Sequence, residues 1–276
     1  MAALKKIFGH TCEACQQGKA HRLPSSQHAP EVFGPGALVS MDFWDACTPH
    51  RHGGQRQVLV IIDHYSGYVR GFLVNQRSDA YLALDMYLNY ARSHGVVVRR
   101  LHKDGAGEFG ENSPGMREVL AKHGLTGCVT TSGADEHRQN GVVERANRTI
   151  REGTAARLIQ AKLGLSWWYY AMQDTLTNNA FVPLRDSPSE TPYSRFHGTQ
   201  PDVTGIRAFG CTAFARVYNP TTKLAARAYT GVHLGKHPDK PVHRVLVKTE
   251  KGGLAILDTP HCRFLEKDFR GLSALG

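Results

Sequence analysis

Three carboxylates have residue types and sequence contexts that suit a metal-dependent reaction. Asp42 lies inside a strand-like segment, Asp104 opens a glycine-rich turn, and Glu144 lies near the start of a long helical segment. Three carboxylates within a few ångströms repel one another unless cations neutralise them. Oxygen-only ligands of this kind suit Mg²⁺ or Mn²⁺, and two such ions roughly 3.5–4 Å apart support phosphoryl transfer. We therefore take these three side chains as candidate catalytic and metal-binding residues.

Other acidic residues compete for the same roles. Asp45 lies nearer the end of its strand than Asp42 and ranks second to it. A single aspartate at a strand end is more often a turn residue, which is the interpretation for Asp63 before Ser66-Gly67. Three further residues rank lower than the chosen triad: Glu108, Asp135 and Glu136. The order and context of the triad, rather than any one residue, favour it.

The segments around the triad predict an α/β sheet with helices. Apolar and β-branched runs predict strands at residues 37–47, 57–63, 68–74, 96–101 and 125–131. Helical spacing with capping residues predicts helices at 78–94, 113–123, 141–163 and 166–182. If the first and fourth strands are neighbours, Asp42 and Asp104 lie side by side, and a helix across the sheet supplies Glu144.

The composition changes at both ends of the chain. Residues 1–30 form a leader with the pair Cys12 and Cys15, which supplies half of a tetrahedral zinc site. After Pro201, short apolar runs alternate with Gly, Pro and Lys turns, as in a small all-β module. The expected domains are therefore a leader at 1–30, a core with a helical extension at 31–204, and a β module at 205–276.

Charge and hydropathy exclude some classes of function. The chain has 276 residues and a formal charge of +10, with no apolar run long enough for a bilayer and no secretory signal at its start. We therefore expect an intracellular protein that is neither secreted nor membrane-bound. Residues 205–276 hold twelve Lys or Arg against five Asp or Glu, net +7, and residues 1–30 add +3. This segregation favours a nucleic-acid partner, and solubilising charge is the alternative.

Two sets of basic residues are candidates for that contact. Along the helix that presents Glu144 lie Arg145, Arg148, Arg151 and Arg157. A solvated helix face, with Glu152 pairing locally, is the alternative. In the β module the candidates are Arg216, Lys223, Arg227, Lys236, Lys240, Arg244 and Lys248. The aromatic run 167–170 is interpreted as core and interface rather than as a platform for base stacking.

Motifs in the same order make the whole chain resemble a copia-type retrotransposon integrase, a fragment of a longer Pol polyprotein. The resemblance covers about residues 8–268. It rests on Cys12-Glu-Ala-Cys15 with the trailing Gly18-Lys19 and Arg22-Leu-Pro24, Val60-Ile-Ile-Asp63-His-Tyr65-Ser66-Gly-Tyr68, Asp104-Gly-Ala-Gly107-Glu108-Phe109, Gln139-Asn140-Gly141-Val142-Val143-Glu144-Arg145-Ala-Asn147-Arg148, Phe209-Gly210-Cys211, Lys223-Leu224 and Gly231-Val-His-Leu234-Gly235.

The resemblance implies an RNase H-like five-stranded mixed sheet with flanking helices, and a small barrel-like C-terminal β module. Asp42, Asp104 and Glu144 would be the catalytic triad and bind two Mg²⁺ or Mn²⁺ ions. Such enzymes trim a DNA 3′ end and then join the freed 3′-hydroxyl to a target phosphodiester. The implied partners are double-stranded DNA, as element ends and as target, and further copies of the chain. The implied location is the nucleus, or a cytoplasmic particle before that stage.

The chain also departs from the family pattern. Gly105 replaces the usual Asn, residues 135–138 replace Tyr-x-Pro-Gln, and the gap from Asp104 to Glu144 is a few residues longer. The family places two histidines before the cysteine pair, and this sequence begins too late to contain both. His10, His21 or His28 could substitute, but none has the expected spacing, so we expect a zinc-site remnant, with Zn²⁺ at Cys12 and Cys15 as the alternative. A decayed or domesticated nucleic-acid-binding fragment is the second hypothesis for the function, and an RNase H-type nuclease is a weaker third.

Overall fold

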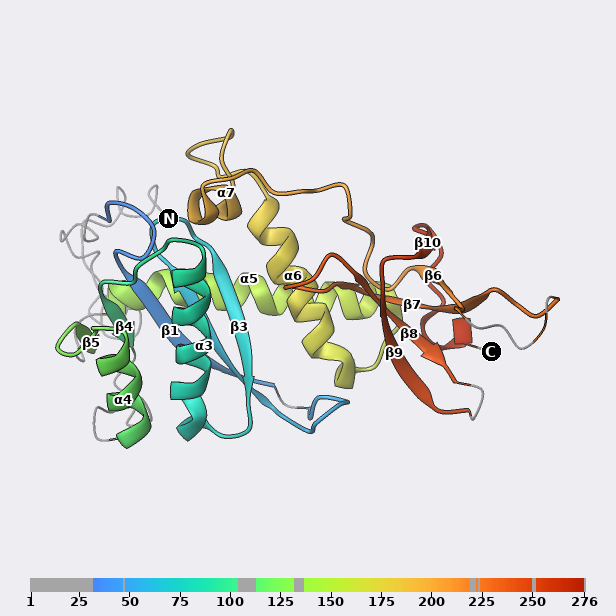
Figure 1. Ribbon diagram of the computed structural model, residues 1–276, viewed down its shortest axis with the longest axis horizontal. Helices are drawn as coiled ribbons and strands as arrows, with labels where there is room; N and C mark the ends of the chain where they lie inside the picture. The colour runs from blue at the N-terminus through green and yellow to red at the C-terminus, as the bar shows by residue number, and fades with distance from the viewer. Residues whose placement is uncertain are drawn as a thin grey trace, which may run out of the picture. The chain divides into compact units, whose positions relative to one another are not determined.

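Two five-stranded sheets organise the part of the chain that the structure describes (Figure 1). The computed structural model describes residues 32–46, 48–103, 113–131, 137–218, 222, 224–249 and 252–275, without the side chains of 130–131 and 137–141. Residues from Val32 onward form one compact unit. The predicted leader with Cys12 and Cys15 lies outside the described residues.

The first sheet is mixed, with the strand order β3-β2-β1-β4-β5. Its strands are β1 (Val39–Asp45), β2 (Gln57–Asp63), β3 (Val69–Val74), β4 (Leu101–Lys103) and β5 (Val129–Thr131). β1, β2 and β3 pair antiparallel, whereas β4 runs parallel to both β1 and β5. The predicted RNase H-like mixed sheet, with the first and fourth strands as neighbours, is confirmed.

Helices cover both faces of this sheet. α3 (Ala80–Ser93) and α4 (Pro114–Lys122) lie on one face, and α5 (His137–Ala161) and α6 (Trp168–Phe181) on the other (Figure 1). The buried strand β2 contributes side chains to the hydrophobic clusters on both faces of the sheet. Leu59 and Ile61 pack toward α3, whereas Val58 and Val60 pack toward α5 and α6. Such burial on both faces explains its nearly continuous apolar run.

The fourth strand differs from the prediction, because residues 96–100 are not part of it and β4 begins at Leu101. Val96 and Val98 are buried against α3, which accounts for their apolar character. The backbone N–H of Arg99 donates to the carbonyl of Gly36, so the segment runs beside the loop before β1. The β-branched run at residues 96–101 therefore indicated burial correctly. Burial alone does not require that a segment pair with a neighbouring strand.

One helical boundary differs from the prediction, and one helix was not predicted. α5 begins at His137 rather than near Gly141, because one glycine costs a helix only about 1 kcal/mol. The short helix α7 (Pro192–His197) was not predicted. It carries a capping box between Thr191 and Ser194 with Pro192 in its first turn, a signal that was readable in the sequence.

The second sheet is antiparallel throughout, in the order β10-β6-β7-β8-β9. Its strands are β6 (Thr212–Arg216), β7 (Ala228–Lys236), β8 (His243–Lys248), β9 (Leu254–Thr259) and β10 (Cys262–Leu265), the last of which was not predicted. One face forms a small core around Ala213, Ala215 and Val245. The all-β character of this module is confirmed.

The other face of the second sheet shares a core with the helices. Val232, Leu234 and Leu246 pack in one cluster with Leu158 of α5 and the aromatic segment at the start of α6. Trp167 and Trp168 are buried in this cluster, so they belong to the core, as expected. No helix in the described part of the chain has the length and apolar character needed to cross a membrane.

Candidate active site

Asp42 lies near the middle of β1 and is held by two hydrogen bonds. Its Oδ1 accepts the backbone N–H of Phe43 at 2.8 Å. Its Oδ2 accepts the side-chain Nδ2–H of Asn147, on α5, also at 2.8 Å. The carboxylate of Asp42 therefore has a fixed orientation and faces the helix that carries Glu144.

The register of α5 decides what lies beside Asp42. Its buried residues recur every three or four positions, as in Val143, Asn147, Ile150, Thr154 and Leu158, and this stripe packs on the sheet. Glu144 lies one turn before Asn147, a spacing that brings two side chains close on a helix surface. The side chain of Glu144 is exposed. α5 therefore contributes Asn147 to Asp42 directly and carries Glu144 next to that contact.

The parallel pairing of β1 and β4 relates the chain position of Asp104 to that of Asp42. The register matches Val39 with Leu101 and Met41 with Lys103, so the pairing ends one residue before Asp42 and one before Asp104. Asp104 lies outside the described residues. Within the residues that are described, no group of three or more His, Cys, Asp or Glu side chains is close enough to hold an ion.

The donor atoms that the structure does describe fit a hard divalent cation. Asp42 and Glu144 offer carboxylate oxygens, which Mg²⁺ and Mn²⁺ prefer. Asn147 is nine-tenths buried, and its Oδ1 has no hydrogen-bond partner although its Nδ2 is used by Asp42. A buried carbonyl oxygen without a partner is costly unless a cation or water satisfies it. Asn147 belongs to the segment around Glu144 that carries the resemblance, but the sequence analysis gave it no role, although its spacing from Glu144 pointed to the same helix face.

The rival carboxylates have other partners. Asp45 is exposed and forms an ion pair with Arg77, with 2.5 Å between Nη2 and Oδ2. Asp63 is fully buried and accepts hydrogen bonds from the backbone N–H of Gly36 and from the N–H and Oγ–H of Ser66. Burial raises the pKa of Asp63, and these hydrogen bonds oppose the rise. Asp63 thus fastens the turn after β2, as its sequence context indicated.

Asp42 shares its face of β1 with another polar residue, Ser40. Ser40 lies two residues earlier on β1, and its Oγ is 2.6 Å from Nε2 of His64. Burial, with a smaller contribution from His102, lowers the pKa of His64 to about 4. A neutral imidazole is therefore expected at neutral pH, and His64 adds no positive charge near the carboxylates.

The arginines of α5 fall into three environments. Arg148 and Arg151 are exposed and lie four and seven residues after Glu144, on its flank of the helix. Arg145 is also exposed but lines a groove of about 430 Å³ toward the end of α6. Arg157, the fourth candidate on this helix, has a different environment from the other three. Its Nε donates to Oδ2 of buried Asp174 at 2.6 Å, so it joins α5 to α6.

The candidate Lys and Arg residues of the C-terminal β module also differ in exposure. Arg216 and Arg227 are exposed, whereas Lys236 is half-buried and lines a pocket. Arg244 is mostly buried and lies 3.8 Å from Asp258, which does not suit the free DNA contact expected of it. Lys223 lies outside the described residues. Exposed Arg263 was missed because β10 was not predicted; its strand pairs with β6, which carries Arg216.

The strand order places this protein in the class of RNase H-like domains with carboxylates on the central strand.

Residues 34–134 match the family model described as the integrase core domain. The retrovirus-related Pol polyprotein from transposon TNT 1-94 of Nicotiana tabacum is 27% identical over 232 residues, covering 81% of this chain and 17% of the polyprotein. That from transposon RE1 of Arabidopsis thaliana is 26% identical over 230 residues, covering 82% and 15%. Part of the chain thus matches the integrase core domain, and most of the chain is similar to retrotransposon Pol polyproteins, which confirms the resemblance found in its motifs.

The chain spans about one sixth of the length of these relatives. Among solved structures, it is similar to a chain of the simian T-cell lymphotropic virus intasome in complex with PP2A regulatory subunit B56 gamma. That match has a TM-score of 0.48 and 13% identity, covering 96% of this chain and 91% of the other. The HTLV-2 integrase catalytic core domain in complex with magnesium matches with a TM-score of 0.44 and 16% identity, covering 60% and 100%.

Proposed function

We propose that this chain is the integrase portion of a retrotransposon Pol polyprotein and joins element DNA to target DNA. The observation that carries the proposal is the hydrogen bond between Asp42 and Asn147, because it brings the helix of Glu144 onto the strand of Asp42. The integrase core match over residues 34–134 supports the same function. The proposed catalytic residues are Asp42, Asp104 and Glu144.

The same three carboxylates would hold two Mg²⁺ or Mn²⁺ ions. Bound ions of this kind activate an attacking oxygen and stabilise a leaving oxygen in phosphoryl transfer. Asn147 would orient Asp42 by donating to one of its oxygens. Arg148 and Arg151, on the flank of Glu144, would bind the phosphates of the incoming strand.

Double-stranded DNA and further copies of the chain are the proposed partners. Exposed Arg216, Arg227 and Arg263 on the second sheet suit contacts to phosphates without reading base sequence. An enzyme that joins element DNA to chromosomes would act in the nucleus, and in a cytoplasmic particle before then. Zinc at Cys12 and Cys15 is a separate proposal, tested by measuring zinc bound to the purified chain and to Cys12→Ser.

A DNA-joining assay tests the proposed chemistry. The purified chain should join a short DNA end to plasmid DNA in Mn²⁺, and neither Asp42→Asn nor Glu144→Gln should support joining. Asp45→Asn is the matched control on the same strand and should retain joining, because Asp45 pairs with Arg77 instead. Joining by Glu144→Gln at the original rate would exclude Glu144 from the triad.

The second candidate function is nucleic-acid binding without catalysis. The departures from the family pattern at Gly105 and at residues 135–138 favour it. It predicts DNA binding that weakens with salt, with no joining in Mg²⁺ or Mn²⁺. Joining that depends on Asp42 would exclude it.

A further inference from the structure

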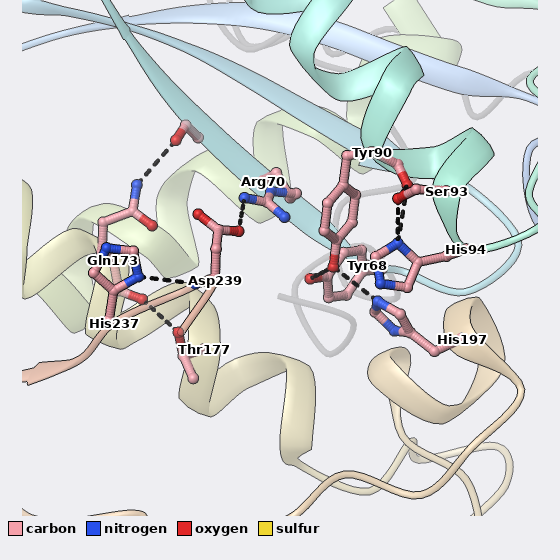
Figure 2. A network of polar contacts seen from close by, with 11 residues as sticks. Tyr68, Arg70, Tyr90, Ser93, His94, Gln173, Thr177, His197, His237 and Asp239 are labelled. Atoms are coloured by element: carbon pink, nitrogen blue, oxygen red, sulfur yellow. Dashed lines mark hydrogen bonds and ion pairs between the residues drawn. The ribbon is translucent and has the colours of Figure 1, made fainter. Parts of the chain in front are cut away.

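A second concave site lies over β3, two strands away from β1 and its Asp42–Asn147 contact. A pocket of about 500 Å³ opens between β3, the C-terminal end of α3, α6, α7 and the turn between β7 and β8 (Figure 2). β3 is separated from β1 by β2, so the pocket and Asp42 are on different strands of the sheet. The size is within the range of pockets that hold small molecules.

One wall of the pocket is a rigid set of aromatic rings (Figure 2). Nδ1 of His197 lies 3.0 Å from the carbonyl of Tyr193, and a carbonyl only accepts, so this nitrogen carries the proton. Nε2 of His197 then accepts from the hydroxyl of Tyr90 at 2.8 Å, which in turn accepts from Tyr68 at 3.1 Å. Burial lowers the pKa of His197, which agrees with a neutral ring. The hydroxyl groups of Tyr68 and Tyr90 are therefore hydrogen-bonded along this wall, and the ring of His197 is neutral.

The rings of this wall are available for stacking. Tyr193 is stacked on His197 with 4.0 Å between ring centroids, and Phe181 contacts the edge of Tyr193. Tyr193, Phe181, Tyr90 and His94 all line the pocket. A planar aromatic ligand gains favourable contacts on such a surface, and stacking of a nucleobase on an aromatic side chain contributes about 1–3 kcal/mol.

The facing wall carries positive charge. Arg70 packs on the Tyr90 ring at 3.8 Å and pairs with Asp239 at 2.9 Å, so these two charges neutralise each other. The remaining charged groups that line the pocket are Lys236, Lys240 and Asp202. Two lysines against one carboxylate leave a net positive charge among the described residues of the lining.

The turn between β7 and β8 adds a neutral donor to this wall. Nδ1 of His237 accepts the backbone N–H of Asp239 at 3.1 Å, so the proton of the neutral ring is on Nε2. Burial lowers the pKa of His237, which favours this neutral form. The last residue of β7, Lys236, and the turn after it therefore offer two ammonium groups and one N–H donor, a set that suits the oxygens of a phosphate.

We propose that this pocket binds a nucleotide, with the base against the rings of Tyr193 and Phe181 and the phosphate at Lys236 and Lys240. The same chemistry is presented by a free mononucleotide and by an unpaired nucleotide of a DNA strand. The site uses neither Asp42 nor Glu144, so it does not depend on the proposed DNA joining.

Calorimetric titration of the full chain tests the proposal. The probes are dAMP, deoxyadenosine and a single-stranded hexadeoxyadenylate. We expect dAMP to bind at least tenfold more tightly than deoxyadenosine, because only dAMP has a phosphate for the lysines. Tighter binding of the hexanucleotide than of dAMP identifies an unpaired strand as the ligand, and equal binding identifies the free nucleotide. No binding of either phosphate-bearing probe, or equal binding of deoxyadenosine and dAMP, would overturn the proposal.

Matched variants separate the pocket from general attraction to a basic protein. Lys240→Glu should weaken dAMP binding tenfold or more, whereas Lys267→Glu, the same charge reversal at an exposed residue outside the pocket, should leave it unchanged. Tyr193→Leu should weaken binding and Tyr193→Phe should restore it. Equal losses in the two lysine variants would overturn the site. Because Lys240 is exposed, its variant keeps the test valid if Tyr193→Leu fails to fold.

Discussion

Asn147 on α5 donates a 2.8 Å hydrogen bond to Asp42 on β1, across 105 residues of sequence. The bond ties the helix of Glu144 to the central strand of the sheet and leaves Oδ1 of Asn147 buried without a partner. It is the most direct structural link between two of the three carboxylates proposed for catalysis. Asn147 is therefore proposed as a positioning residue rather than as part of the triad.

Replacing Asn147 should impair the metal-dependent reaction more than the fold. Asn147→Ala removes the donor that orients Asp42, and we expect DNA joining to fall at least tenfold and to need more Mn²⁺ for half of its maximum. The loss of one buried hydrogen bond costs about 1–3 kcal/mol of stability. Thr149→Ala, at an exposed position on the same helix, should behave as the unsubstituted chain does. An unchanged Mn²⁺ requirement in Asn147→Ala would contradict the positioning role.

Arg148 is expected to contact DNA phosphate next to the triad. Arg148→Glu should weaken DNA binding across sequences and reduce the slope of log affinity against log salt by about 1. Arg92→Glu makes the same charge change on an exposed part of α3, which lies on the other face of the sheet, and should have little effect. Binding titrations at several salt concentrations measure both slopes. Equal effects of the two variants would indicate general charge attraction only.

Arg157 forms an ion pair with the buried carboxylate of Asp174, and the contribution of this pair to stability can be measured. Arg157→Leu removes the only cation paired with the buried carboxylate of Asp174 among the described residues, which keeps the hydrogen bond from Asn178, and we expect a loss of about 3 kcal/mol in the free energy of unfolding. The double variant Arg157→Leu/Asp174→Leu should recover most of that loss, because no unpaired charge remains. Urea unfolding of the three proteins decides the question. A single variant as stable as the original would show that the pair contributes nothing.

Because His233 is buried as a neutral ring, we expect the protein to lose stability in mild acid. Its Nδ1 donates to the carbonyl of Ala208, its Nε2 accepts from His243, and burial lowers its pKa to about 4. The unfolded chain takes up this proton near pH 6.5, so the stabilisation is complete above pH 6.5 and is lost as the pH falls toward 4.

At pH 5 this linkage amounts to about 2 kcal/mol relative to pH 7. His233→Gln should flatten the pH dependence of urea unfolding by that amount. His261→Gln, at an exposed position beside β10, should follow the original profile. A His233→Gln profile as steep as the original would rule out this linkage.

Removing the second sheet should affect more than DNA binding. Deleting residues 205–276 removes a net charge of +7, and it also exposes the apolar cluster that Val232, Leu234 and Leu246 share with α5 and the start of α6. We expect the truncated chain to unfold at a lower temperature and to aggregate. Charge reversal at Arg216 and Arg263 is the cleaner test of DNA contact. A truncated chain with an unchanged melting temperature would show that the shared core is dispensable.

Much of the architecture was readable in the sequence because it follows from local patterns. The apolar run of β2 and the helical spacing in α3 report burial directly, and glycines end both α3 and α4 near the predicted positions. The fourth strand was misplaced because Val96 and Val98 are buried without being paired in the sheet. The division of the chain at residue 205 stays a prediction.

The sequence by itself determined the order of the strands and helices from β1 to α6, the net charge of each segment and the candidates Asp42 and Glu144, since residue types and short-range spacing carry that information. Only the tertiary structure decided which of the candidate arginines on α5 are exposed and which one forms an ion pair with Asp174. It also decided that Asn147 contacts Asp42, and that the turn after β7 meets Arg70 to complete a pocket. These outcomes depend on which distant segments pack together, a long-range property that periodicity along the chain does not contain.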